Sequence, residues 1–265
     1  MEAIECFGAY NDATQLHARV PVQSAITPLK RTDLPAQINA AGYVRASAEQ
    51  IVAAFDLDPD SLAQLTPAWD RLPRDAYLLD GGRYRSRRHS CFIQSFRPDS
   101  LERAPHRAHW QPTTYNALHG GIERLFEPIE EVVADAPAFR RLVSGLGVLF
   151  ARVRATPRWY VEAHQFRIDT ADGIGRPTPE GAHRDGVDFV ALLLIARRGI
   201  RGGETRVFEA QGERGVRFTM QDPFSVLLLD DERVVHETTP IQGEDESGVR
   251  DTLVLTYRAG GFQAP

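Results

Sequence analysis

The residues of this sequence whose types and spacing could do chemistry are His183, Asp185 and His236, with Arg250 and Thr252 further along the chain. Two imidazoles and one carboxylate can bind one face of a metal ion and leave the opposite coordination positions open, as in non-haem Fe(II) oxygenases. A His-x-Asp pair alone carries little weight, because 8 His and 36 acidic residues among 265 give about one His-x-acid pair by chance. The elements around these residues must therefore supply the specificity.

Three apolar runs lie beside these residues and predict the strands that position them: residues 186–196, 224–230 and 253–257. Alternate side chains of an extended chain face the same way, so His183 and Asp185 can face a metal together while the residue between them points away. The candidate ligands are therefore expected at strand ends.

The segment between His236 and Arg250 is polar and rich in turn formers after its first few residues, which predicts a hairpin loop. A hairpin would return Arg250 beside the strand of His236, and alternation would place Arg250 and Thr252 on one face. A guanidinium gives a carboxylate two parallel charge-assisted hydrogen bonds and keeps its proton. A plainer interpretation pairs Arg250 with the acidic residues 244–246 in an exposed contact that is worth little.

With these motifs the chain resembles the bacterial 2-oxoglutarate- and Fe(II)-dependent dioxygenases that hydroxylate free L-amino acids, the family that includes isoleucine 4-hydroxylase. The segments that carry the resemblance are residues 179–190, 202–205, 236–241 and 250–252, with a weaker match at 83–88 and 111–124. The resemblance covers roughly residues 80–258, and the ordered set from Pro179 to Thr252 is its most specific part.

The resemblance implies a mainly β fold, a double-stranded β-helix (jelly roll) whose mouth holds the metal. It implies that His183, Asp185 and His236 bind iron as the catalytic centre, and that Arg250, helped by Thr252, holds the distal carboxylate of 2-oxoglutarate. With O2 at the remaining position, the reaction would release succinate and CO2 and hydroxylate an unactivated C–H bond. The small-molecule substrate is expected to be a free L-amino acid or derivative, and aliphatic and polar side chains both stay open.

Further polar residues upstream of the metal segment or beside it are candidates for ligand contacts. For the substrate they are Gln111, Tyr115, Asn116, Arg167 and Glu180, and for the cosubstrate Gln165. Gln165 and Arg167 share one face of the predicted strand 161–168, directly before the metal segment. Six other histidines are interpreted as structural: His17, His89, His106, His109, His119 and His164.

Helices are expected outside the strands. Ser47 is a cap before a helical pattern, Asp58 begins a second short helix, and residues 128–154 show helical spacing with a break at Pro137. We expect a helical extension over residues 1–80 that packs on a core over residues 81–265, within one compact domain.

Composition limits the partners. The net charge of −5 argues against a nucleic-acid surface, and the basic run 83–89 is interpreted as a strand with a solvated basic face. No apolar stretch has the length of a membrane span and the N-terminus lacks a signal pattern, which predicts the cytoplasm. Cys6 and Cys91 are expected to be reduced thiols. The oligomeric state stays open, with a homodimer among the options.

Two alternatives belong to other functional classes. The same donors could hold zinc for hydrolysis, but the chain has no His-Glu-x-x-His helix and a hydrolase would not need Arg250 and Thr252. A jelly-roll binding module without chemistry is disfavoured because all three donor residues are present.

Overall fold

The computed structural model describes residues 33–96, 100–116, 118–244 and 247–265. Its main sheet is built from β1 (Tyr43–Ala46), β2 (Arg85–Ser95), β3 (Leu101–Arg103), β4 (Arg158–Asp169), β5 (Phe189–Arg198), β9 (Val226–Asp230) and β12 (Val249–Arg258). These strands lie in the order β1-β9-β5-β12-β4-β2-β3, and every pairing is antiparallel. The long central strands give the site a rigid floor.

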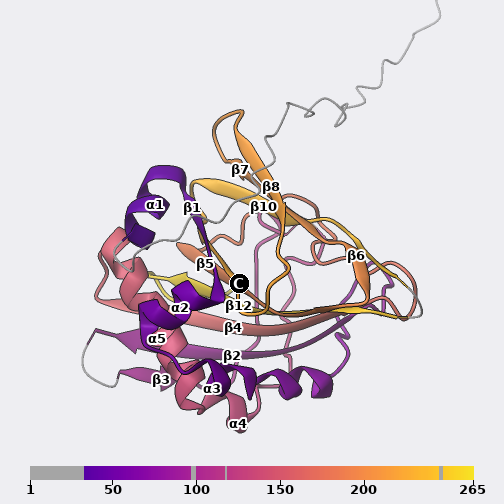
Figure 1. The fold of residues 1–265 in the computed structure, drawn as a ribbon, viewed down its shortest axis with the longest axis horizontal. Helices are drawn as coiled ribbons and strands as arrows, with labels where there is room; N and C mark the ends of the chain where they lie inside the picture. The colour runs from indigo at the N-terminus through magenta and orange to yellow at the C-terminus, as the bar shows by residue number, and fades with distance from the viewer. Residues whose placement is uncertain (1–32, 97–99, 117, 245–246) are drawn as a thin grey trace, which may run out of the picture.

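A smaller sheet faces this floor. It contains β7 (Glu204–Glu209), β8 (Gly215–Thr219) and β10 (Val234–Thr238) in the order β10-β7-β8, and a separate pair joins β6 (Ile200–Gly202) to β11 (Ile241–Gly243). In Figure 1 the strands β7, β8 and β10 stand above the long strands β12, β4 and β2. The architecture is the expected mainly β double-stranded β-helix with a few helices.

Helices cover the outer face of the main sheet. They are α1 (Asp33–Ala41), α2 (Ala48–Phe55), α3 (Pro59–Ala63), the 3-10 helix η1 (Thr66–Arg71), α4 (Glu131–Ala134) and α5 (Pro137–Val153). Figure 1 shows α3, α4 and α5 on the side of β2 and β4 that faces away from the small sheet. The predicted helix starts are confirmed: Ser47 forms a capping box with Gln50, Asp58 caps α3, and Pro137 opens α5.

Strand alternation gives β4 an apolar face and a polar face. On β4, Trp159, Val161 and Ala163 join the core that packs under α5, whereas Glu162 and His164 line a cavity between the sheets. The outer face therefore supplies stability, and the inner face is left for chemistry.

One expectation about a connection needs correction. The predicted hairpin between His236 and Arg250 is wrong, because β10 pairs with β7 in the small sheet while β12 pairs with β4 and β5 in the main sheet. The chain between them crosses from one sheet to the other through β11, and a run of polar turn formers does not distinguish a hairpin from such a crossing.

The N-terminal segment contributes more than helices, since β1 pairs with β9 at the edge of the main sheet. The domain division at residue 80 stays a prediction, and residues 1–32 lie outside the described part. No helix in the ranges that the structure describes is long and apolar enough to cross a membrane. Cys91 is a buried free thiol, and Cys6 lies outside the described residues.

Candidate active site

A backbone bridge brings the two candidate histidine ligands together. The His183 N–H donates to the His236 carbonyl at 3.0 Å, and the His236 N–H donates back to the His183 carbonyl at 2.9 Å. This antiparallel bridge joins the loop before β5 to the middle of β10 and places the two rings 4.7 Å apart. His236 therefore lies within a strand of the small sheet, and not beyond a strand end as expected.

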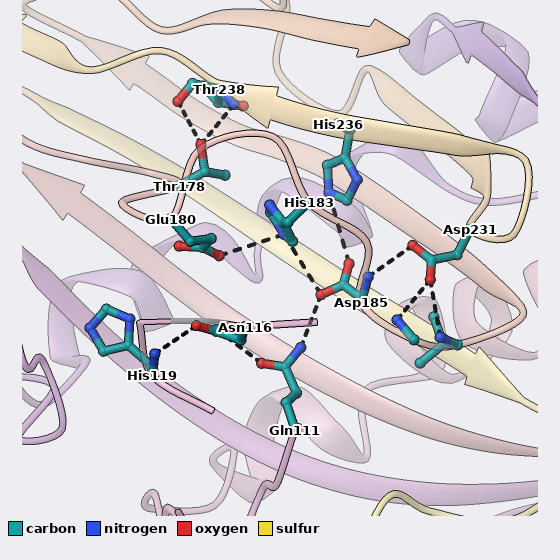
Figure 2. Close-up of polar contacts among 12 residues, drawn as sticks. Gln111, Asn116, His119, Thr178, Glu180, His183, Asp185, Asp231, His236 and Thr238 are labelled. Carbon is teal, nitrogen blue, oxygen red and sulfur yellow. Dashed lines mark hydrogen bonds and ion pairs between the residues drawn. The ribbon is translucent and has the colours of Figure 1, made fainter. Parts of the chain in front are cut away.

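The three donor groups face a common space. His183 Nε2 lies 3.9 Å from Asp185 Oδ1, and His236 Nε2 lies 3.8 Å from Asp185 Oδ2. These separations exceed hydrogen-bond length, so no hydrogen bond between these atoms occupies their lone pairs. Donor atoms that share an ion at about 2 Å each lie about 3 to 4 Å apart. Figure 2 shows the three side chains converging, and this donor set fits a divalent transition metal with open positions.

The histidine tautomers suit a metal. His183 Nδ1 lies 2.9 Å from the Gly181 carbonyl oxygen, which only accepts, so Nδ1 carries the proton and Nε2 keeps its lone pair. Burial holds the pKa of His236 well below its usual value, helped by neighbouring His183. Burial also lowers the pKa of His183, but the carboxylates of Asp185, Glu180 and Asp231 and the hydrogen bond to Gly181 together raise it by more.

Neighbouring side chains fix Asp185. The Asp231 carboxylate accepts hydrogen bonds from the backbone N–H groups of Asp185, Gly186 and Val187 at 3.0, 2.8 and 3.1 Å. Gln111 Nε2 donates to Asp185 Oδ1 at 3.2 Å (Figure 2). Sequence reasoning missed Asp231, although a carboxylate directly after a buried strand was a signal that could have found it.

The predicted carboxylate anchor lies in the same cavity. Arg250 is 3% exposed, and its Nη2 is buried without a hydrogen-bond partner. No carboxylate of the described residues, which include Glu244 but not 245–246, lies within ion-pair distance of Arg250. Burial, with the cation of Arg197, lowers its pKa to about 10. Thr252 lines the cavity beside Arg250, as alternation along β12 predicts.

The structure places three of the predicted ligand contacts, Gln165, Arg167 and Tyr115, outside the lining of the cavity. Gln165 and Arg167 share a face of β4 as expected, but it is the face that points away from the cavity. There Gln165 is fully buried, and Arg167 pairs with Asp251 at 2.7 Å and with Asp70 at 2.7 Å. Tyr115 does not line the cavity, because its ring packs against the backbone of Gly186.

The other predicted contacts do line the cavity. Gln111, Asn116 and Glu180 all face it. Asn116 Nδ2 donates to Gln111 Oε1 at 3.2 Å, and Asn116 Oδ1 accepts from the His119 backbone N–H at 2.7 Å. Glu180 Oε1 lies 3.6 Å from His183 Nε2, and its Oε2 is buried without a partner.

A second cluster of donor residues lines the same cavity. Its members are His89, His109, Glu162 and His164, all buried and close enough for their donor atoms to hold an ion. Sequence reasoning treated these histidines as structural and gave Glu162 no role, because β2, β4 and the loop of His109 come together only in the folded chain.

Hydrogen bonds within this second cluster occupy the groups that face Glu162. Arg87 Nη2 lies 2.7 Å from His164 Nδ1, and a guanidinium only donates, so His164 carries its own proton on Nε2. His109 Nδ1 and His89 Nε2 lie 2.6 and 3.1 Å from Glu162 Oε2 and donate to it. The nitrogens that face Glu162 are therefore protonated and cannot share an ion with it, whereas no hydrogen bond joins the donor atoms of His183, Asp185 and His236 to one another.

The charge states agree with this network. Burial raises the pKa of Glu162, but His109 and His89 lower it by more, so the carboxyl is ionised well below its usual range. Burial lowers the pKa of His109 to about 4, so the ring is neutral near pH 7. The cluster is thus a buried carboxylate held by neutral imidazole donors.

The basic run is a strand, but its face is not solvated. Arg85 and Arg87 of β2 point into the cavity and are 7% and 3% exposed. Asp75 pairs with Arg85 at 2.7 Å, and Arg87 lies between the rings of Phe126 and Phe166 at 3.8 and 4.4 Å. The predicted solvated basic face is wrong because carboxylates and aromatic rings from other segments receive these cations inside the barrel.

Known proteins share this fold. A sequence model of the 2OG-Fe dioxygenase family matches residues 66–256. A bsmA homologue from Methylobium petroleophilum PM1 is 52% identical over 93% of this chain and 99% of that chain, with a TM-score of 0.87. IDO from Bacillus thuringiensis is 18% identical over 90% of this chain and 99% of that chain, with a TM-score of 0.72. The Fe(II)/(alpha)ketoglutarate-dependent dioxygenase TqaL is 18% identical over 86% of each chain, with a TM-score of 0.67.

No curated protein matches the chain. The family match nevertheless spans most of the sequence and includes both the metal donors and the buried guanidinium. The two structures of 18% identity show the shared fold alone. The chain therefore belongs to the 2OG-Fe dioxygenase family and is a non-haem dioxygenase that uses Fe(II), 2-oxoglutarate and O2.

Proposed function

We propose that this enzyme hydroxylates an unactivated C–H bond of a free L-amino acid. In the proposal His183, Asp185 and His236 bind Fe(II), and Arg250 with Thr252 holds the distal carboxylate of 2-oxoglutarate. The observation that carries it is one cavity in which three free metal donors, an unpaired guanidinium and an unpaired carboxylate oxygen all face the same space. The unpaired carboxylate oxygen, Oε2 of Glu180, suits an ammonium group on the substrate.

Glu180 supports an amino group on the substrate. Its Oε2 is buried and unpaired in the cavity, next to the proposed iron ligand His183. A buried carboxyl oxygen without a partner is costly, and an ammonium group would relieve that cost with a charge-assisted hydrogen bond. Glu180 would thereby hold the substrate beside the metal.

The bound Fe(II) supplies the redox chemistry that converts 2-oxoglutarate and O2 to succinate and CO2 and inserts one oxygen atom into the substrate. The residues of this chain supply position. Arg250 fixes the far end of the cosubstrate, Gln111 and Asp231 hold Asp185 in one orientation, and the apolar side chains of Phe166 and Val254 narrow the cavity.

The test is a screen of free L-amino acids with Fe(II), ascorbate and 2-oxoglutarate. We expect at least one amino acid to increase succinate release and to gain the mass of one oxygen atom. His183→Ala should abolish both signals, because the metal site then lacks one of its three protein ligands. If no amino acid gains oxygen although the enzyme still converts 2-oxoglutarate to succinate, the proposed substrate class is wrong.

Family membership does not favour a zinc-dependent hydrolase or an inactive binding module. The proposal also places the enzyme in the cytoplasm, with which the free thiol of Cys91 is compatible.

A further inference from the structure

The cavity contains four buried guanidinium groups, and two of them lack a carboxylate partner. Arg85 pairs with Asp75 at 2.7 Å, and Arg87 lies 3.9 Å from the same carboxylate. Among the residues that the structure describes, no carboxylate lies within ion-pair distance of Arg124 or Arg250. Arg250 is the proposed anchor for the cosubstrate, so Arg124 remains without an assigned role.

The structure holds Arg124 firmly in place. Its backbone forms an antiparallel bridge with His109, with hydrogen bonds of 2.9 and 3.0 Å, and the side chain is 2% exposed. Its Nη2 donates to Gln111 Oε1 at 3.1 Å, whereas its Nε is buried without a partner. Burial lowers its pKa to about 10, with Arg85 adding to the effect, so the group stays charged at neutral pH. A buried cation with a free N–H requires an acceptor.

The carboxylates near Arg124 act on it only from a distance. Asp75 pairs with Arg85, Glu162 accepts from His109 and His89, and the charges of Asp75, Glu180 and Glu162 raise the pKa of Arg124 without an ion pair. None of these carboxylates occupies the free N–H of Arg124. The ionised Glu162 would repel a doubly charged ligand, so a singly charged carboxylate fits better than a phosphate.

Gln111 connects Arg124 to the metal site. Its Oε1 accepts from Arg124, and its Nε2 donates to Asp185 at 3.2 Å (Figure 2). One side chain thus separates Arg124 from a proposed iron ligand. An acid bound at Arg124 would place carbons a few bonds from its carboxylate next to the metal.

We propose that Arg124 binds a carboxylate of the substrate, in the cavity where Arg250 binds a carboxylate of the cosubstrate. The inference rests on the proposed function, which it deepens: the substrate carries one carboxylate, and Arg124 binds that group.

The test measures binding to the anaerobic Fe(II)- and 2-oxoglutarate-loaded enzyme by calorimetry, where no turnover occurs without O2. The probes are the proteinogenic L-amino acids and their α-carboxamides. We expect the amide of the best-binding acid to bind at least about tenfold more weakly, because the charge-assisted hydrogen bond is lost. Arg124→Gln should weaken binding of the acid by a similar factor, so that the acid and its amide bind equally well.

Three further variants separate recognition from folding. Arg124→Lys keeps the positive charge but not the paired N–H donors of the guanidinium. It should retain part of the preference for the acid. Arg250→Gln should weaken binding of 2-oxoglutarate and keep the preference for the acid over its amide. Arg141→Gln removes an exposed guanidinium outside the cavity and should change neither affinity.

Equal binding of acid and amide to the wild type would overturn the proposal. The proposal would also be overturned if the Arg124→Gln variant still bound the acid more tightly than the amide. A variant that lost affinity for 2-oxoglutarate, and not for the acid, would overturn it as well. Failure of the proposed function gives a different result: no amino acid is hydroxylated, but unbranched monocarboxylates from propanoate to hexanoate bind the wild type and lose affinity in Arg124→Gln. If neither panel binds the wild type, Arg124 has no carboxylate to hold and the proposal is wrong.

Discussion

Asp185 is held from two sides by residues that do not belong to the metal donor set. Gln111 donates to its Oδ1, while Asp231 binds the backbone of its loop. Gln111 is itself fixed, because its Oε1 accepts from Asn116 at 3.2 Å and from Arg124 at 3.1 Å. A ligand carboxylate with one orientation binds metal better than a mobile one, so metal affinity depends on side chains that never touch the ion.

Gln111→Leu should therefore weaken Fe(II) binding by about 10- to 100-fold, the usual cost of losing an outer hydrogen bond at a metal site. The measurement is an anaerobic Fe(II) titration in the absence of substrate. Gln165→Leu is the matched control, because Gln165 is fully buried on the opposite face of β4 and both its amide atoms lack partners. Equal Fe(II) affinities in the two variants would show that Gln111 does not support the metal site.

Spacing in the sequence identified the metal donors and Arg250. It could not show which face of a strand turns toward the cavity. The metal donors and Arg250 do meet in one cavity. Gln165 and Arg167 were assigned to the cavity because alternation gives two equivalent faces, and only the packing of α5 decides between them. Glu162 was missed because its partners come from β2 and from the loop of His109.

Helix α5 fixes the sheet on which the cavity depends. Trp159 of β4 donates from Nε1 to the Gly147 carbonyl at 2.9 Å, and the Tyr257 hydroxyl of β12 donates to the Val143 carbonyl at 2.9 Å. Both rings are fully buried, so each brings an apolar body and a satisfied polar end into the interface. The strands that carry Glu162 and Arg250 are thereby fastened to one helix.

Phe150→Ala should lower the free energy of unfolding by about 3 to 5 kcal/mol, because it removes a buried ring from this interface. Phe150 stacks on Phe189 with centroids 4.6 Å apart and meets Tyr257 at 4.9 Å. Urea denaturation measures the loss, and Fe(II) affinity without denaturant should stay near that of the wild type. Val148→Ala, on the exposed side of α5, should cost less than about 0.5 kcal/mol. Similar losses in both variants would contradict the role given to α5.

The strands themselves could be read from the sequence, since the three apolar runs correspond to β5, β9 and β12. The connection from His236 to Arg250 could not. Its polar residues are compatible with a two-strand turn, but β10 completes the small sheet with β7 while β12 lies centrally in the main sheet. Pairing of strands distant in sequence decides this, and local turn chemistry carries no information about it.

The cavity side of β2 and β4 collects buried titratable groups around Glu162. The inner wall holds Glu162 as an anion among neutral histidines, and burial lowers the pKa of His89, His109 and His164 alike. In the unfolded chain these rings regain an ordinary pKa near 6.5. The cavity therefore makes the stability of the entire fold depend on pH.

The sign of that dependence follows from which state binds the proton. For His109 the folded pKa is about 4, against an ordinary value of 6.5. Between these values the unfolded chain takes up a proton that the folded chain does not, so stability is complete above about pH 6.5 and falls towards pH 4. The depressed pKa of Glu162 acts in the same direction at lower pH, since its stabilisation is lost as the carboxylate protonates.

His109→Gln should flatten this profile. Glutamine can still donate to Glu162 but does not titrate, so the variant should lose about 3 kcal/mol less than the wild type between pH 6.5 and 4. Urea denaturation at intervals across this range gives both profiles. His106→Gln makes the same substitution at an exposed position and should keep the wild-type slope. A His109→Gln profile parallel to that of the wild type would mean that the ring is already protonated in the folded protein, and that Glu162 is held by a cation instead of a neutral donor.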